Sequence, residues 1–119
     1  MGSNYPFELI AGNHDDGAVA NEGYIDIFAQ CLPNKMPNIN GTYGRRYYFD
    51  YPATNPYARF ILIDPNIEYV AGTASYTSGT ANYTWTQNTI DGARAAGLKW
   101  VIVGMHKVCL TAGNKSCEI

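Results

Sequence analysis

The stretch that decides the fold is RYYFDYPATNPYARFILID, residues 46–64. It contains two runs rich in aromatic and β-branched residues, 46–51 and 58–64, separated by a turn that contains Pro and Asn. Runs of this composition favour strands, and the short turn between them is typical of a hairpin. The sequence therefore predicts an antiparallel hairpin whose second strand lies in the centre of a sheet.

Helical patterns lie on both sides of this hairpin. Apolar residues at helical spacing over 22–32 predict a short amphipathic helix that covers the sheet and ends at Pro33. A second helical pattern runs over 83–96, and Gly97 suits the position just after the end of a helix.

Further stretches complete the predicted order of elements. Apolar runs at 7–11 and 99–105 predict buried strands, whereas 34–42 and the Gly-, Ser- and Tyr-rich stretch 65–83 are predicted loops. Helices and strands that alternate in this way favour the α/β class. We expect a partial layered β-sheet with flanking helices.

The composition argues against some classes of binding partner. A chain of 119 residues with 46% hydrophobic and 15% charged residues is typical of one globular domain. The net charge is -2 and no basic cluster exceeds Arg45-Arg46, so we expect no nucleic acid partner. No apolar run is long enough for a signal peptide or a membrane span, so we expect no membrane partner.

The ends and the cysteines carry weaker signals. Residues 1–3 look like an expression leader, which leaves 4–119 as the domain. The content of Tyr, Gly, Asn and Thr indicates an extracytoplasmic or secreted parent protein. Cys109 and Cys117 bracket a short polar loop that could close as a disulfide in an oxidising compartment. With Cys31 they form an odd set, and three free thiols are the alternative.

Histidine follows two of the predicted buried strands. The tetrapeptide Gly12-Asn13-His14-Asp15 comes directly after 7–11, and His106 comes directly after 99–105. In α/β sheets, ligands bind at the junctions where strands pass into loops. Amide oxygens and imidazole nitrogens can ligate divalent metals, so a metal site is the first hypothesis. The alternatives are a turn role for Asn13 and a buried structural role for His106.

The tetrapeptide resembles the Gly-Asn-His-Asp/Glu signature of calcineurin-like metallophosphoesterases, and most closely that of the purple-acid-phosphatase-like branch. The stretch 84–88, the predicted helix and the segment 100–107 are similar to the part of the family in which a helix leads to a strand that ends in a metal-ligating histidine. The Asp-x-His, Gly-Asp and Gly-His-x-His motifs of the family do not occur in this chain. The resemblance therefore implies the central fragment of a metallophosphoesterase sandwich.

This resemblance implies a chemistry for the chain. Asn13 and His106 would ligate one ion of a pair of Fe, Zn or Mn ions, and a metal-bound hydroxide would hydrolyse a small phosphomonoester or phosphodiester. Because three of the motifs are absent, we expect this metal pair to be incomplete or absent in the chain. The alternative function is a catalytically incomplete fragment that self-associates and has no activity of its own.

The resemblance also implies the catalytic residues. His14 would assist the leaving group, because an imidazole can give up a proton near neutral pH. Asp15 would orient the ring of His14 if its carboxylate reaches it. The alternative is an exposed His14 beside an Asp15 that caps the following helix.

Other features are weaker candidates. Arg45-Arg46 could present guanidiniums to a phosphate or could be a solvated entrance to a strand. The tyrosines of 65–83 could form a rim for the substrate or pack the loop onto the domain, and Asp64 could serve the turn with Pro65. A truncated sheet has open edges, so we also expect a homo-oligomer formed through exposed sheet edges.

Overall fold

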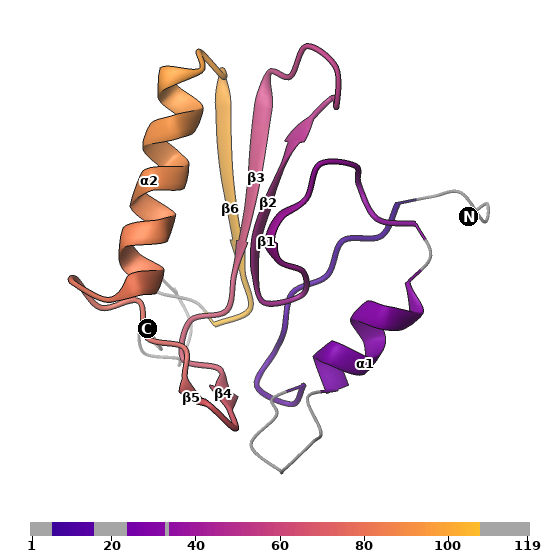
Figure 1. Ribbon diagram of the computed structural model, residues 1–119, viewed down its shortest axis with the longest axis vertical. Coiled ribbons are helices and arrows are strands. Elements are labelled where there is room, and N and C mark those ends of the chain that lie inside the picture. The colour runs from indigo at the N-terminus through magenta and orange to yellow at the C-terminus, as the bar shows by residue number, and fades with distance from the viewer. Residues whose placement is uncertain (1–5, 16–23, 33, 108–119) are drawn as a thin grey trace, which may run out of the picture.

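The computed structural model describes residues 6–15, 24–32 and 34–107. They form a small α/β domain with one four-stranded mixed sheet, a two-stranded ribbon and two helices (Figure 1). In chain order the elements are α1 (Tyr24–Cys31), β1 (Asn40–Thr42), β2 (Arg46–Tyr51), β3 (Ala58–Ile63), β4 (Glu68–Tyr69), β5 (Gly72–Thr73), α2 (Ala81–Ala95) and β6 (Trp100–Met105).

The predicted hairpin forms the centre of the main sheet. Strands β1, β2 and β3 are antiparallel neighbours, and β6 pairs parallel to β3, which gives the order β1-β2-β3-β6. Phe49 lies opposite Phe60 and their rings stack with centroids 5.2 Å apart. Phe60 in turn pairs with Ile102 of β6. The hairpin and the central place of its second strand are confirmed.

Helix α2 covers one face of this sheet (Figure 1). Its N-cap is Thr80, whose side chain accepts a hydrogen bond from the Tyr83 N–H, and Gly97 with a φ of 75° follows its end. Arg59 of β3 fastens the layers, since it donates to both oxygens of Asp50 at 2.7 and 2.8 Å and to the Thr89 carbonyl at 3.0 Å. The ion pair joins β2 to β3, and the hydrogen bond to Thr89 joins β3 to α2.

Several predicted elements differ from the structure. The run 7–11 is not a buried strand, because its only ladder contact is one parallel bridge between Ile10 and Gly44, and Phe7 is exposed. Tyrosine hydroxyls satisfy its carbonyls instead, with Tyr47 donating to Leu9 at 2.7 Å. The predicted loop 34–42 contains β1, and the predicted loop 65–83 contains β4, β5 and the start of α2.

The first helix forms but packs elsewhere than predicted. Helix α1 lies near the ends of the strands rather than over the sheet (Figure 1). Its buried residue Ile25 joins Ala11 and Ile67 in a core cluster, with Leu9 and Tyr69 packed against it. Half-exposed apolar residues on its other side leave most of the helix outside the core. No helix in the described ranges is both long and apolar enough to cross a bilayer.

Candidate functional site

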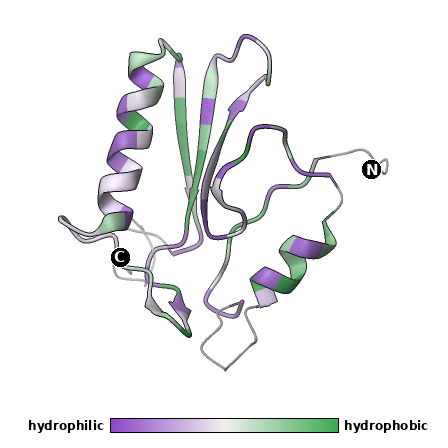
Figure 2. Ribbon diagram, in the orientation of Figure 1, coloured by the Kyte–Doolittle hydropathy of each residue, from purple (hydrophilic) through white to green (hydrophobic). Residues whose placement is uncertain are grey.

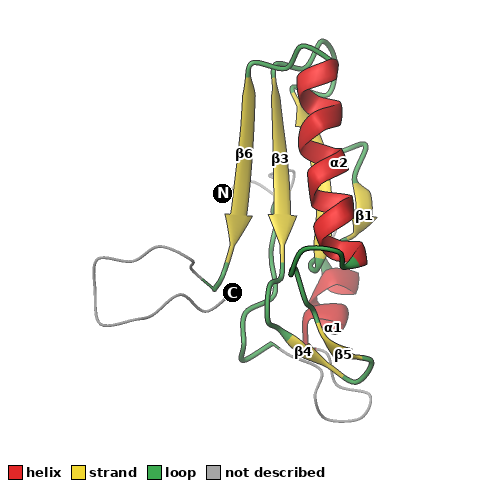
Figure 3. Ribbon diagram, turned by 90° about the vertical axis from the view of Figure 1, so that its left-hand side faces the viewer, coloured by secondary structure: helices red, strands yellow, loops and turns green. Residues whose placement is uncertain are grey.

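The carboxyl ends of β3 and β6 point toward the end of the molecule where α1 and the β4-β5 ribbon lie (Figures 1 and 3). The turn 10–15 reaches the same end, because the Ala11 N–H donates to the Gly44 carbonyl at 2.8 Å next to the Ile10 bridge. This anchor places the motif turn beside the end of β6. Strand ends of this kind are the usual position of ligand sites in α/β sheets.

The turn closes on itself through Asp15. The Gly12 N–H donates to Asp15 Oδ2 at 3.1 Å, and the Asp15 N–H donates to the Gly12 carbonyl at 3.0 Å. Aspartate side chains commonly stabilise turns by such local hydrogen bonds. The Asp15 carboxylate thus accepts from Gly12. That it also orients the ring of His14 stays a prediction. His14 itself is exposed.

Asn13 and His106 meet across this turn although 93 positions separate them in the sequence. His106 Nε2 lies 2.9 Å from Asn13 Oδ1. The ring of His106 also packs on Gly12, where a Cβ atom would lie 3.2 Å from both Nε2 and Cδ2. Glycine at this position therefore lets the imidazole lie against the turn. The two residues predicted as ligands to one ion are neighbours.

The pair fits part of a metal shell and cannot complete one. Both donors are neutral, and the described residues contain no group of three or more His, Cys, Asp or Glu side chains that could hold a metal ion. Divalent ions of the expected kinds take four or more ligands, commonly with a carboxylate among them. The described residues alone do not fit a metal pair.

The contact between Asn13 and His106 suits one tautomer of the ring. An amide oxygen can only accept, so a hydrogen bond from Nε2 to Oδ1 forms in the tautomer that carries the proton on Nε2. A metal ion held through Nε2 would need the other tautomer, with the proton on Nδ1.

Asp64 takes part in the turn after β3, where its carbonyl accepts from the Ile67 N–H at 3.2 Å, and its side chain has a further structural role that sequence reasoning missed. It ends β3 with 4% exposure and accepts hydrogen bonds from the Tyr69 and Tyr76 hydroxyls, each at 2.7 Å. Burial raises the pKa of both tyrosines, and the hydrogen bonds to the Asp64 carboxylate raise it further. These tyrosines pack the loop onto the domain, as one of the two predictions had it. Aromatic residues in a Gly- and Ser-rich loop were the available signal.

Lys107 and the arginine pair are likewise engaged within the domain. Lys107 Nζ donates to the Asn66 carbonyl at 2.9 Å, which ties the residue after His106 to the loop beyond β3. Arg45 forms an ion pair with Asp26 of α1, and Arg46 donates to the Asn82 side chain. The charged heads of both arginines therefore serve contacts between elements.

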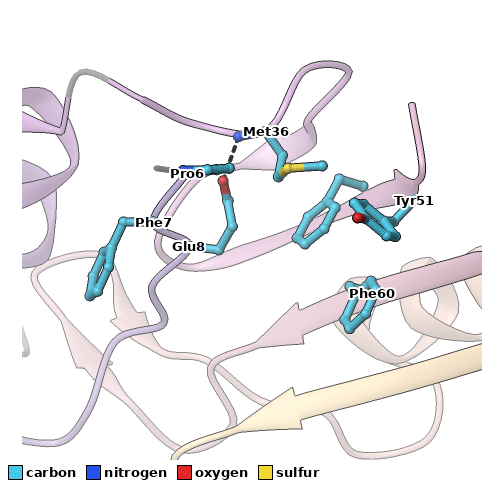
Figure 4. Close-up of a pocket in the computed structure, with 7 residues that line it drawn as sticks. Pro6, Phe7, Glu8, Met36, Tyr51 and Phe60 are labelled. Atoms are coloured by element: carbon cyan, nitrogen blue, oxygen red, sulfur yellow. Dashed lines mark hydrogen bonds between the residues drawn. The ribbon is translucent and has the colours of Figure 1, made fainter. Parts of the chain in front are cut away.

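A groove lies on the sheet face opposite α2, apart from the strand-end pair (Figure 4). It has a volume of about 560 Å³, and aromatic rings of β2 and β3 form its floor. Glu8 lies at its wall, where one carboxyl oxygen accepts a hydrogen bond from the Met36 N–H. The other oxygen, Oε2, is shielded from solvent and has no hydrogen-bond partner among the described residues. A ligand in the groove would not reach that oxygen without movement of the chain.

Of the cysteines, Cys31 is exposed with a free thiol, whereas Cys109 and Cys117 lie outside the described residues. Comparisons of the chain with models of protein families, with curated proteins and with solved structures return no match.

Proposed function

We propose that the chain carries part of the centre of a metal-dependent phosphoesterase of the calcineurin-like, purple-acid-phosphatase-like kind. The observation that supports this proposal is the distance of 2.9 Å between His106 Nε2 and Asn13 Oδ1 at the end of a parallel strand. Two residue types that can ligate one ion converge there from opposite ends of the described chain. The four-stranded sheet with α2 on one face is compatible with one layer of a metallophosphoesterase sandwich.

Each residue has a role in this proposal. Asn13 and His106 supply two neutral ligands, and donors outside the described residues complete the shell. A bound metal ion would activate water and neutralise phosphoryl oxygens. His14, exposed beside Asn13, donates a proton to the departing alkoxide, and Asp15 holds the turn that presents both side chains. The substrate is a small phosphomonoester or phosphodiester from an extracytoplasmic setting.

A second candidate is a catalytically incomplete domain, favoured by the two-donor set. In this candidate the two neutral donors hold no ion, since the described residues contain no group of three or more His, Cys, Asp or Glu side chains to support them. In that case the hydrogen bond between Asn13 and His106 is a structural tie between the turn and β6.

The test measures metal and turnover together. The purified chain is equilibrated with Zn²⁺ or Mn²⁺, dialysed and subjected to elemental analysis, and hydrolysis of p-nitrophenyl phosphate and its bis ester is assayed. The phosphoesterase candidate requires bound metal that is lost in Asn13→Ala and His106→Ala but kept in Asn88→Ala, an exposed control on α2. We expect His14→Ala to keep the metal and to lose turnover by about 10²–10⁴-fold.

The outcomes separate the two candidates. Loss of metal in the two ligand variants, with loss of turnover in His14→Ala, supports the phosphoesterase. Absence of both metal and turnover in the parent chain contradicts it and supports the incomplete domain. Metal that survives in His106→Ala would show that the ion binds elsewhere.

A further inference from the structure

A small polar cavity lies between the turn 42–45, the loop after β3 and the first turn of α2. It has a volume of about 210 Å³, and its lining includes Thr42, Arg45, Arg46, Asp64, Tyr69 and Asn82. Figure 2 shows hydrophobic residues along the middle of β6 and hydrophilic ones in the loops that follow β3 and β6. The volume is below the roughly 300–1,000 Å³ of sites for drug-sized ligands, so the cavity suits a small polar group.

Arg46 reaches this cavity as a half-buried cation whose contacts are all neutral. One of its Nη1 hydrogens is donated to the side-chain oxygen of Asn82, and its guanidinium carbon lies 4.9 Å from the centroid of the Trp85 ring. None of the ion pairs in the described part of the chain includes Arg46. Charges that are withdrawn from water are normally paired, so Arg46 lacks a counterion.

Arg45 adds a second guanidinium to the lining. It pairs with Asp26 of α1 through Nε and Nη2, and its guanidinium carbon lies 3.9 Å from the centroid of the Tyr69 ring. The Arg45 N–H donates to the Thr42 carbonyl at 3.1 Å, which closes the turn that carries both arginines. The Nη1 group of Arg45 and the Nε and Nη2 groups of Arg46 have no acceptor among the described residues. The turn and the rings thus hold donors that have no partner.

The carboxylate of Asp64 does not serve as that counterion. Asp64 is 4% exposed, and its two oxygens accept from the Tyr69 and Tyr76 hydroxyls at 2.7 Å each. No ion pair joins Asp64 to Arg46 in the described ranges. An anion from solution could therefore bind to Arg46 without displacing an existing ion pair.

We propose that this cavity binds a phosphate group, with Arg46 as the main donor and with Arg45 and the Thr42 hydroxyl as further donors. Guanidinium groups match the oxygens of phosphate and carboxylate, and they bind them with charge-assisted hydrogen bonds. Donors on two guanidiniums and a hydroxyl can engage more oxygens of a phosphate than of a carboxylate. This site needs no metal, so it is independent of the proposed phosphoesterase centre.

The test is a titration of the full chain, labelled with ¹⁵N, with inorganic phosphate. Amide spectra are recorded in EDTA at constant pH and constant ionic strength, with phosphate up to about 20 mM. We expect saturable shifts of the amides of 42–46 and of Asn82, with a dissociation constant of about 1 mM, because water screens a site at the surface. A parent chain whose amides in this turn show no saturable shift overturns the proposal.

A pair of matched variants locates the donor. Arg46→Gln should weaken phosphate binding roughly tenfold or more, because it removes the unpaired cation. Arg94→Gln carries the same change on α2 at a side chain that is 73% exposed and lies outside this cavity, so it should bind phosphate like the parent. Equal affinities of Arg46→Gln and Arg94→Gln would overturn the proposal.

A second variant keeps Arg46 in place and supplies the counterion from within the chain. Asn82→Asp is nearly isosteric, and it would put a carboxylate where Arg46 now meets an amide oxygen. We expect Asn82→Asp to keep the fold, as judged by circular dichroism and thermal unfolding, and to weaken phosphate binding roughly tenfold or more. An unchanged affinity in this folded variant would contradict a role for Arg46.

Further arms distinguish the site and the source of the phosphate. His106→Ala should bind phosphate like the parent, whereas loss of binding in that variant would place the anion at the Asn13–His106 pair and overturn the proposal. Acetate that binds as tightly as phosphate would overturn the choice of a phosphate group. Glycerol 2-phosphate that binds at least as tightly as inorganic phosphate supports the phosphate of an organic molecule as the ligand, and weaker binding supports the free ion.

Discussion

At the scale of single residues, Glu8 has a carboxyl group whose charged form is poorly stabilised by its surroundings. Its carboxyl is half enclosed between the N-terminal segment and the sheet, and Oε2 has no hydrogen-bond partner in the described part of the chain. The nearby Tyr47 hydroxyl has one proton, which it donates to the Leu9 carbonyl. Burial raises the pKa of Glu8 above its ordinary value of 4.5, and the hydrogen bond from the Met36 N–H offsets this rise only in part.

This shift predicts a dependence of stability on pH. A carboxyl whose pKa is higher in the folded state contributes stability that is fully present below 4.5 and is lost as the pH rises through the raised value. Glu8→Gln removes the charge at nearly constant shape. We expect its Tm to match that of the parent at about pH 4 and to exceed it by a few degrees at about pH 7.

Thermal unfolding followed by circular dichroism at several pH values checks this expectation. Glu68→Gln is the control, because Glu68 is exposed on β4 and its neutral form should leave the pH dependence unchanged. A Glu8→Gln variant that is less stable than the parent at neutral pH would mean that the ionised carboxylate is well satisfied.

Single residues also show how much of the site could be predicted from the sequence. Asn13 and His106 were paired from the motif and from the strands that precede each of them, and their side chains do meet. The strand before Asn13 was wrong, yet one bridge at Ile10 suffices to place the turn. The tyrosines of the loop were a signal that it packs on the domain, but a loop without periodicity does not show that Asp64 accepts both hydroxyls.

At the scale of elements, the position of α1 depends on Gly44. This residue has a φ of 81°, and a Cβ atom there would lie 2.8 Å from Ile25 Cγ1 of α1 and 3.2 Å from Leu9 Cδ1. Its carbonyl also anchors Ala11. One small residue thus lets the helix, the N-terminal segment and the start of the hairpin come together.

Gly44→Ala should therefore lower the free energy of unfolding by more than the strain of a left-handed backbone conformation alone. Gly79 is the matched control, because it has a φ of 90° and a Cβ atom added there would lie in open space. Gly79→Ala should lose about 1–2 kcal/mol of unfolding free energy from backbone strain. Gly44→Ala should lose at least ~1 kcal/mol more, because the added methyl group overpacks the contact with Ile25.

Urea denaturation of both variants gives the comparison. Equal losses would contradict the close packing of α1 on the turn.

The elements with long, periodic patterns, β2, β3, α2 and β6, were predicted within a few residues. Those that failed were short, and their form depends on partners distant in the sequence. Strand β1 needs β2, and the carbonyls of Phe7 and Leu9 accept hydrogen bonds from tyrosine side chains.

At the scale of the whole molecule, β6 links the sheet to the candidate site, because the strand ends at Met105 and His106 follows it directly. An edge strand held by one neighbour opens more readily than the centre of a sheet. Each opening of β6 would carry the imidazole away from Asn13. Whatever clamps the outer edge would thus hold the two donors together, and by thermodynamic reciprocity whatever bridges the donors would tighten the clamp. The affinity of this protein for a ligand at the pair would then depend on one equilibrium, the docking of β6 on β3.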